Sequence, residues 1–171
     1  MRQPIIFGLK AGGVLILISL ITYLGGIDLF VNNWIVFLQF LIAPVFVFIA
    51  IKNQRKSEGG HISFGRAFLT GIVTYAVMRG VFLVYSIALY NVIDPDLKYS
   101  VAEAAFDNQI EMMENWGAPE SEIDKAYDQY DDLPKRYEVG AQLSFYFILL
   151  LLGSFWSLIA ALIFKRKPKV E

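Results

Sequence analysis

Hydrophobic residues gather in four long runs along the chain, and polar stretches separate these runs. The runs cover residues 5–24, 34–51, 67–90 and 142–164. A helix needs about 20 mostly apolar residues to cross the hydrocarbon core of a bilayer. Pro44 lies inside the second run, where neighbouring helices can satisfy the backbone groups that a proline leaves free. The pattern predicts an all-α integral membrane bundle of four transmembrane helices, forming one membrane domain over residues 1–171.

The first run also has the polarity of a signal peptide, because Arg2 and Lys10 precede most of its apolar residues. A cleavage site needs a pair of small residues at its end, and Tyr23 and Leu24 stand there instead. We therefore expect an uncleaved transmembrane helix.

The stretch between the third and fourth runs is polar and acidic. Residues 91–141 hold 13 acidic and four basic residues. Asp94-Pro95 is typical of a helix start and Gly117 of a helix end, while Pro119 starts a second helix that Pro134 closes. The pattern predicts an extracytoplasmic helical hairpin between transmembrane helices 3 and 4. This insert is too short to be an independent domain with its own core.

Composition supports a membrane protein and excludes several kinds of site. Hydrophobic residues make up 56% of the chain and charged residues 18%, whereas soluble domains average about 45–50% and about 25%. The absence of cysteine excludes disulfides, thiolate metal sites and cysteine nucleophiles. The single histidine, His61, leaves little room for a histidine metal centre, and we interpret it as a solvated loop residue. We expect no cofactor and no nucleic-acid partner.

Basic residues are concentrated in two of the connections and predict the orientation. Lysine and arginine favour the cytoplasmic side, and the 25–33 connection contains neither. The basic residues that we expect to set the topology, and to contact anionic lipid headgroups, are Lys52, Arg55, Lys56 and Arg66 in the middle loop and Lys165, Arg166, Lys167 and Lys169 in the tail. Both chain termini are therefore predicted to be cytoplasmic, with residues 91–141 outside.

Arg79 is the exception within the apolar runs, because it lies near the middle of the third. A charged side chain at the bilayer centre costs at least about 3 kcal/mol, so such residues usually face the bundle interior. The helical stripe around Arg79 includes the hydroxyls of Tyr75, Ser86 and Tyr90, and Ser154 of the fourth run falls at a similar depth.

Two interpretations of Arg79 stay open. No Asp or Glu occurs in any of the four runs, so the proton relays and cation pumps that use a buried carboxylate lack support. Arg79 could bind an anion, such as a lipid phosphate or carboxylate, through its forked donors. Alternatively, hydroxyls and backbone carbonyls could satisfy it, so that it fixes the helix register. The candidate contact residues for an anion or lipid are Arg79, Tyr75, Ser86 and Ser154.

Other patterns have simpler explanations. We interpret an acidic ridge, formed by Glu103, Asp107, Glu111 and Glu114, as a solvated helix face, with a site for divalent cations or a basic partner as the alternative. Small residues recur every four positions at Gly8 and Gly12, and again at Gly153, Ser157 and Ala161. Such faces let helices approach closely. We interpret them as packing seams within the bundle, with a homodimer seam as the alternative.

Several segments together resemble a known family. They are "FGLKAGGVLILISL", "ISFGRAFLTGIVTYAV", the "IDPDL" that leads into the acidic insert, and the aromatic, serine-containing fourth run with its basic tail. On these segments the chain resembles the domain of unknown function 4199 family of small bacterial membrane proteins, over nearly its whole length. The resemblance implies four membrane helices and a bacterial cytoplasmic (inner) membrane. It implies no activity and no catalytic residues, and we assign Arg79 no place in the family pattern.

Two function classes therefore compete. The first is a non-enzymatic structural, interaction or accessory subunit, whose partners would be the lipid bilayer and another membrane protein or a second copy of the chain. The alternative is an anion- or lipid-binding, transporter-like protein centred on Arg79, which requires a polar cavity that reaches this residue. An enzyme is disfavoured, because the sequence shows no nucleophile–base pair, metal-ligand set or phosphate-binding loop.

Overall fold

The computed structural model describes residues 2–165, and these residues form helices joined by short turns. The chain order is α1 (Arg2–Leu24), α2 (Ile27–Phe30), α3 (Asn33–Ser57), α4 (Phe64–Ala88), the π-helix η1 (Leu89–Ile93), α5 (Leu97–Asn115), α6 (Glu120–Asp128), the 3-10 helices η2 (Tyr130–Asp132) and η3 (Pro134–Tyr137), and α7 (Val139–Phe164). No strand occurs among the described residues, so the all-α prediction is confirmed.

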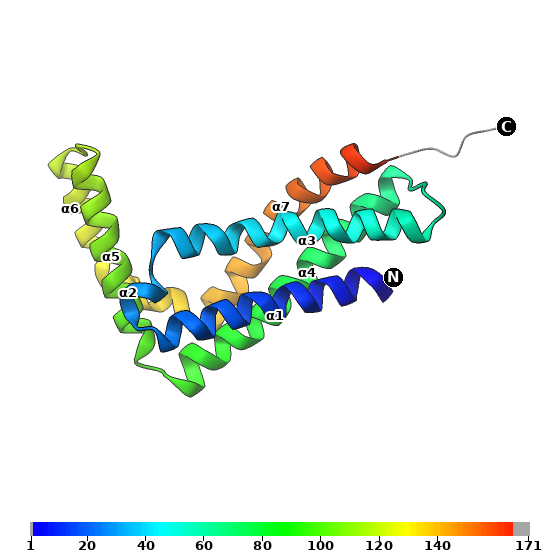
Figure 1. The fold of residues 1–171 in the computed structure, drawn as a ribbon. Coiled ribbons are helices and arrows are strands. Elements are labelled where there is room, and N and C mark those ends of the chain that lie inside the picture. The colour runs from blue at the N-terminus through cyan, green and yellow to red at the C-terminus, as the bar shows by residue number, and fades with distance from the viewer. Residues whose placement is uncertain (1, 166–171) are drawn as a thin grey trace.

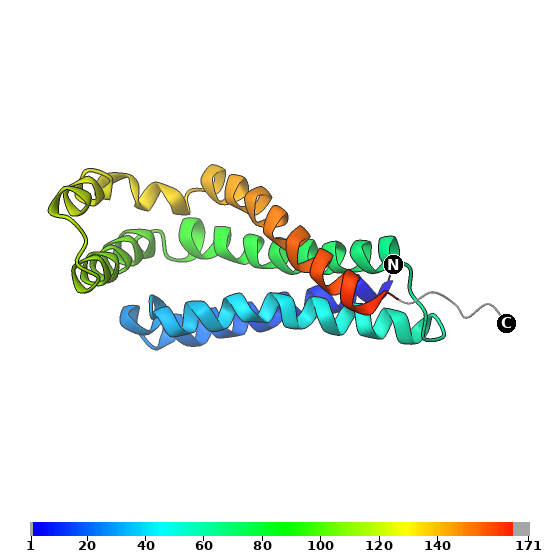
Figure 2. The same cartoon turned by 90° about the horizontal axis from the view of Figure 1, so that it is seen from above.

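Four helical segments are long and apolar enough to cross a membrane, as the four hydrophobic runs predict. They are Arg2–Leu24, Ile27–Ser57, Phe64–Ile93 and Val139–Phe164. In Figures 1 and 2, α1, α3, α4 and α7 lie side by side as one bundle, and α4 packs against each of the other three. The chain is therefore a multi-pass membrane protein.

Small residues allow the close packing of α4 on α1 and on α7. A Cβ atom added to Gly8 of α1 would lie 2.7 Å from the Thr74 carbonyl oxygen of α4. A Cβ atom on Gly71 of α4 would lie 2.7 Å from the Ser157 hydroxyl of α7. Backbones approach this closely only where a side chain is missing or very small. Gly8, Gly12, Gly153 and Ser157 thus lie at helix contacts within one chain, as the packing-seam interpretation expects.

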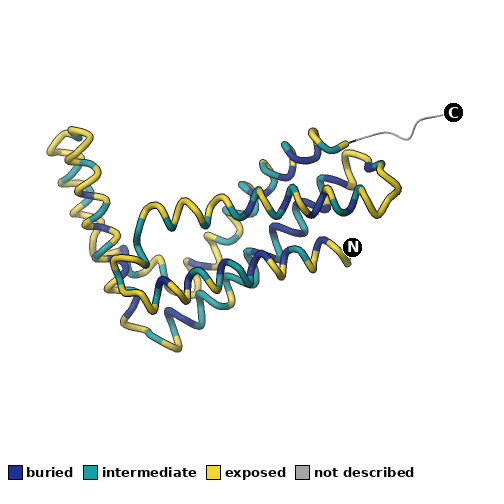
Figure 3. Tube along the Cα trace, in the orientation of Figure 1, coloured by how far each residue is buried: buried dark blue, intermediate teal, exposed yellow. Residues whose placement is uncertain are grey.

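The core runs along the inner faces of the four helices. Figure 3 shows the buried positions on the sides where the helices meet. The larger fully buried side chains include Leu15, Val47, Ile51, Tyr75 and Met78. The first half of α3 contributes little to this core, because most of its apolar side chains, beginning with Trp34, are exposed.

The acidic segment between α4 and α7 forms α5 and α6, which project from one end of the bundle (Figure 1). Leu97 and Val101 at the start of α5 pack with Leu89 and Tyr90 of η1. Farther along, Phe106 of α5 contacts the rings of Tyr127 and Tyr130 at 5.0 and 4.9 Å between centroids. The segment is therefore attached through the base of α5 and has a small apolar cluster of its own.

The helix ends differ in detail from the ends of the hydrophobic runs. Helix α3 continues to Ser57, six residues past the apolar run, because a helix end is set by hydrogen bonding and not by hydropathy. The third run continues beyond Ala88 as the π-helix η1, which the hydrophobic pattern does not predict. Gly117 has φ +70° directly after the C-cap Trp116, so this glycine ends α5 in the left-handed conformation.

Candidate functional site

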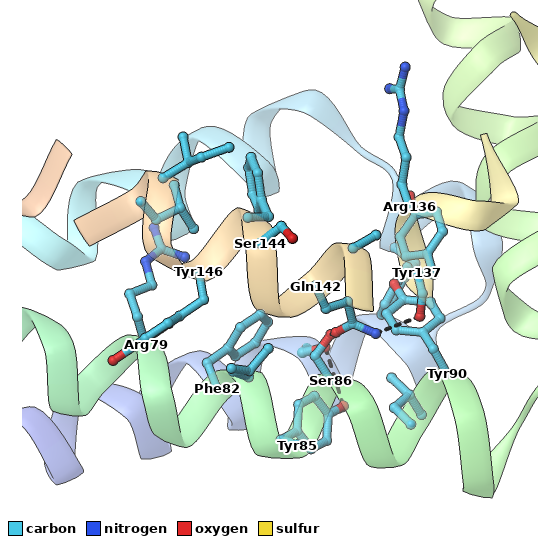
Figure 4. A pocket seen from close by; sticks show the side chains of 18 residues that line it. Arg79, Phe82, Tyr85, Ser86, Tyr90, Arg136, Tyr137, Gln142, Ser144 and Tyr146 are labelled. Atoms are coloured by element: carbon cyan, nitrogen blue, oxygen red, sulfur yellow. Dashed lines mark hydrogen bonds between the residues drawn. The ribbon is translucent and has the colours of Figure 1, made fainter. Parts of the chain in front are cut away.

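A cavity of about 600 Å³ lies between α4 and α7, toward the end of the bundle that carries α5 (Figure 4). It is lined by Ser19, Phe30, Arg79, Phe82, Leu83, Tyr85, Ser86, Leu89, Tyr90, Arg136, Tyr137, Ala141, Gln142, Ser144, Phe145, Tyr146, Ile148 and Leu149. Most of the wall is apolar or aromatic, and a few polar groups point into it. Binding pockets for small molecules have this size and this character.

Arg79 lies at one end of the cavity, and its side chain extends from α4 toward α7 (Figure 4). Its guanidinium carbon lies 5.6 Å from the centre of the Tyr75 ring, a distance typical of a cation–π contact. The Nε atom is buried and has no hydrogen-bond partner within residues 2–165. Neither ion pair of the described chain includes Arg79, so its charge has no counter-ion there.

Tyr75 lies beside Arg79 on α4 and packs against α7. Its side chain is 1% exposed, and its ring lies so close to Gly153 that a Cβ atom there would be 2.2 Å from a ring carbon. The Tyr75 hydroxyl is buried without a hydrogen-bond partner among the described residues. One turn farther, Gly71 packs on Ser157. The helices are therefore in direct contact on this side of Arg79 and diverge only on the other side.

Hydrogen bonds connect α4, η3 and α7 at the opposite end of the cavity. The Ser86 hydroxyl donates to the Gln142 side-chain oxygen at 2.6 Å, and the Gln142 amide donates to the Tyr137 carbonyl at 2.6 Å. The Tyr90 and Tyr137 rings lie 4.6 Å apart, centre to centre. Burial raises the pKa of the Tyr137 phenol, so this hydroxyl stays neutral at ordinary pH. These contacts hold the start of α7 against η1.

Tyr146 crosses from α7 to α4 beside Arg79 (Figure 4). Its hydroxyl donates to the Ala76 carbonyl at 3.3 Å. A Cβ atom at Gly80 would lie 3.8 Å from the Tyr146 oxygen, an ordinary contact distance, so Tyr146 packs beside this position. The Tyr146 hydroxyl therefore hydrogen-bonds to the backbone of α4 and does not bind Arg79.

The four residues predicted to contact an anion do not all lie together. Arg79 and Ser86 line the cavity, and Tyr75 lies beneath the Arg79 guanidinium. Ser154 does not line the cavity, and its hydroxyl donates to the Leu150 carbonyl of its own helix at 2.9 Å. The contact of Tyr75 with Gly153 sets a register in which Leu149 lines the cavity instead.

Sequence reasoning missed Gln142, Tyr146 and Tyr137. Gln142 and Tyr146 are polar residues four positions apart in a mostly apolar helix, so they share one face. That spacing was a usable signal. Tyr137 lies outside the hydrophobic runs, and only the packing of η3 on η1 brings it to the site.

The basic residues predicted to set the topology lie at the other end of the bundle. Lys52, Arg55 and Lys56 end α3, Arg66 is in the first turn of α4, and Lys165 follows α7. Arg166, Lys167 and Lys169 lie outside the described residues. Figure 1 shows the starts of α1 and α4 and the ends of α3 and α7 at this one end. The structure contains no bilayer, so the cytoplasmic orientation stays a prediction.

Glu58 joins the loop between α3 and α4 to both helices. Its carboxylate accepts hydrogen bonds from the Gln54 amide at 2.6 Å and from Arg66 Nε at 3.0 Å. The Gln54 hydrogen bond, followed by the Arg66 interaction, lowers the pKa of the Glu58 carboxyl. Arg66 is thereby paired, in contrast to Arg79.

The acidic ridge lies on the exposed face of α5. Glu103, Asp107, Glu111 and Glu114 are all exposed. Within residues 2–165, no group of three or more His, Cys, Asp or Glu side chains is arranged to hold a metal ion. The geometry therefore agrees with a solvated helix face. His61 lies in the α3–α4 loop, where Nδ1 is 3.0 Å from the Gly59 carbonyl oxygen.

Comparison with known proteins finds one family, described as a protein of unknown function (DUF4199), which matches residues 6–166. The match covers nearly the whole chain, including most of α1, the whole of α3, α4 and α7, and both α5 and α6. No curated protein and no solved structure matches.

Proposed function

The chain belongs to the DUF4199 family of proteins of unknown function, and we propose that it is a membrane protein that binds an anion at Arg79, in the cavity between α4 and α7. The observation that carries the proposal is an unpaired arginine that lines a cavity within the membrane-spanning part of the chain. We further propose a bacterial cytoplasmic membrane with both termini in the cytoplasm, on the strength of the basic residues at one end of the bundle.

The position of Arg79 along α4 supports this proposal. Arg79 is about 22 Å from Phe64 and about 14 Å from Ala88 at 1.5 Å per residue, so its charge lies well inside the span. Keeping a charge at such a depth costs at least about 3 kcal/mol unless a partner compensates it. A bound anion would supply that compensation through charge-assisted hydrogen bonds, which are roughly twice as strong as neutral ones.

The charges around the cavity also favour an anion. Its lining includes two arginines, Arg79 and Arg136, and no acidic residue. The neighbouring segment 91–141, in contrast, holds 13 acidic residues. A positive site beneath an acidic surface selects against cations in the cavity, whereas the surface itself would attract them.

Binding explains the site better than catalysis does. The lining offers hydroxyl groups but no His, Asp, Glu, Lys or Cys that could activate them as nucleophiles. The accessory-subunit interpretation needs no cavity at Arg79, and it stays a prediction that co-purification of a partner would test.

Binding of anionic amphiphiles to the purified protein tests the proposal. We suggest oleate, oleoyl lysophosphatidylglycerol and oleoyl lysophosphatidate as probes in a neutral maltoside detergent, with uncharged monoolein as the reference. Binding to the native protein is measured by the rise in melting temperature with probe concentration. We expect at least one anionic probe to bind, and Arg79→Leu to weaken its binding by about 10- to 100-fold, because a hydrogen bond to a charged group contributes about 1.5–3 kcal/mol.

Lys10→Leu is the matched control, because Lys10 is an exposed cation on α1 that does not line the cavity. Arg79→Lys keeps the positive charge but loses the planar, two-donor guanidinium. We expect it to bind the anionic probe more weakly than the native protein and more tightly than Arg79→Leu. The probe-free melting temperature of Arg79→Leu should equal or exceed that of the native protein. If every anionic probe binds Arg79→Leu as well as the native protein, Arg79 is not an anion site. A large loss of probe-free stability together with unchanged binding would favour a register-fixing role.

A further inference from the structure

We infer that the cavity takes a single-chain amphiphile with a monoanionic headgroup, which reaches Arg79 sideways from the bilayer and leaves its chain along the exposed face of α7. This inference rests on the proposed anion site at Arg79 and adds the class of ligand and the direction of its approach.

The first observation is that the α7 wall of the cavity is also an exposed face of the molecule. Ala141, Ser144, Phe145 and Ile148 all line the cavity, and their spacing places them on one stripe of the helix. All four are exposed, and Phe145 and Ile148 retain 59% of their accessible surface. A cavity whose lining is exposed over a whole helical stripe is open along that stripe and is not enclosed.

The opening lies within the span. Phe145 and Ile148 follow the start of α7 by about 9 and 14 Å at 1.5 Å per residue, inside the segment Val139–Phe164 that is long and apolar enough to cross a membrane. Hydrocarbon, not water, faces a transmembrane helix at this depth. A molecule that uses this opening therefore comes from the lipid phase.

The first half of α3 leaves this side of the bundle open. In Figure 2, α3 lies beside α1, and the first half of α7 lies beside α4, away from α3. Helices α3 and α7 contact each other farther along α7, where the Phe40 ring lies against the Trp156 ring at 6.1 Å between centroids. Trp34, Phe37 and Leu41, before and beside this contact, remain exposed. An apolar chain therefore has two exposed apolar surfaces, α3 and α7, along which to lie.

The headgroup end of the cavity accommodates one negative charge. Arg79 supplies a single cation there, because the Arg136 side chain lies at the opposite end of the cavity and extends away from it (Figure 4). The Arg79 Nε is buried, whereas the two terminal Nη atoms are not. The Nη atoms are therefore the donors that a ligand in the cavity can reach. Two Nη donors match the two oxygens of a carboxylate. A dianionic headgroup would leave one charge uncompensated in a low-dielectric site, which is costly.

The walls of the cavity near Arg79 favour a headgroup with one chain. The cavity has a volume of about 600 Å³, and near Arg79 it is bounded by the bulky side chains of Phe82 and Tyr146. A fatty acid has one acyl chain and a small carboxylate headgroup, so it needs less space between these walls than a two-chain lipid. The geometry therefore points to a fatty-acid-like carboxylate, with its headgroup deeper in the membrane than ordinary lipid headgroups lie.

Blocking the opening without changing Arg79 tests the direction of approach. We suggest Ile148→Trp, which fills the exposed stripe beside the cavity, and Phe147→Trp as the matched control. Phe147 is the adjacent residue of α7, is also exposed, and does not line the cavity. The probe is oleate in a neutral maltoside detergent, and binding is measured by titration calorimetry. We expect Ile148→Trp to weaken oleate binding by at least about tenfold and Phe147→Trp to leave it within about twofold.

Headgroup and chain are tested with further probes on the native protein. We expect oleate to bind more tightly than oleoyl lysophosphatidate, and hexanoate, which lacks the long chain, to bind at least about tenfold more weakly than oleate. If Ile148→Trp lowers the probe-free melting temperature by more than a few degrees, Ser144→Trp on the same stripe replaces it.

The outcomes separate this inference from the proposed function. If Arg79→Leu abolishes oleate binding but the tryptophan variants of the stripe do not change it, the anion site stands and the lateral approach is overturned. If oleoyl lysophosphatidate binds more tightly than oleate in an Arg79-dependent manner, the inference of a monoanionic headgroup is overturned. If Arg79→Leu leaves oleate binding unchanged, the proposed function itself fails.

Discussion

Tyr75 is buried and Arg79 is partly buried, and the contact between them satisfies their polar groups only in part. The guanidinium lies over the Tyr75 ring, but Arg79 Nε and the Tyr75 hydroxyl both lack a hydrogen-bond partner within residues 2–165. A buried polar atom without a partner costs about 1–3 kcal/mol relative to one that is hydrogen-bonded. The contribution of Tyr75 to packing comes from its flat ring, which fills the space beside Gly153 and lies against the guanidinium.

Replacing Tyr75 separates these two contributions at the residue scale. We expect Tyr75→Phe to leave the free energy of unfolding unchanged or to raise it by about 1 kcal/mol, because it removes an unsatisfied hydroxyl and keeps the ring. Tyr75→Ala should lower it by about 3–5 kcal/mol, since it leaves a void beside Gly153. Unfolding in mixed micelles with increasing dodecyl sulfate measures both variants. A Phe variant that is strongly destabilised would mean that the hydroxyl has a partner, such as a buried water.

At the scale of the helices, glycines decide how closely α1 packs on α4. Gly8 lies against the Thr74 carbonyl and Val77, and Gly12 lies against Val81. Gly13, the residue after Gly12, has no atom within 4 Å of the place where its Cβ would be. The same helix thus contains glycines that packing requires and one that it does not require.

This difference predicts opposite effects of the same substitution within α1. Gly8→Ala should lower the free energy of unfolding by about 1–3 kcal/mol, because the added methyl group meets backbone of α4 and forces the helices apart. Gly13→Ala should be neutral or stabilising by up to about 1 kcal/mol, because alanine is the better helix former. Melting temperatures in one detergent compare the two variants. Equal effects would mean that α1 and α4 do not pack as closely as the structure shows.

At the scale of the whole molecule, charge is segregated between the two ends of the bundle. Residues 91–141 hold 13 of the 16 acidic residues, and the opposite end carries the basic residues that end α3 and begin α4. This arrangement follows the rule that lysine and arginine favour the cytoplasmic side. The orientation is therefore testable as a property of the entire chain.

The absence of cysteine makes that test direct, because a single introduced cysteine is the only thiol. We expect Ser121→Cys, on the exposed surface of α6, to react with a membrane-impermeant maleimide in intact cells. Ser57→Cys, at the exposed end of α3, should react only after the membrane is permeabilised. The extent of labelling is read by the shift in mass on a gel. The reverse pattern would invert the topology, and labelling of both from outside would contradict an odd number of spans between them.

The sequence by itself determined the four spans, the absence of a carboxylate within them and the position of Arg79 inside the third. These properties depend on local composition and on the length that a bilayer requires, and both can be read along the chain. The register of α4 against α7 depends on which small residues meet which rings, so only the tertiary structure could show that Leu149 lines the cavity and that Ser154 does not. The cavity itself is likewise a tertiary property. On one side of Arg79, Gly71 and Gly153 allow α4 and α7 to pack in direct contact. At the far end, the hydrogen bond between Gln142 and the Tyr137 carbonyl fixes the start of α7, and the cavity is the space that remains between these two contacts.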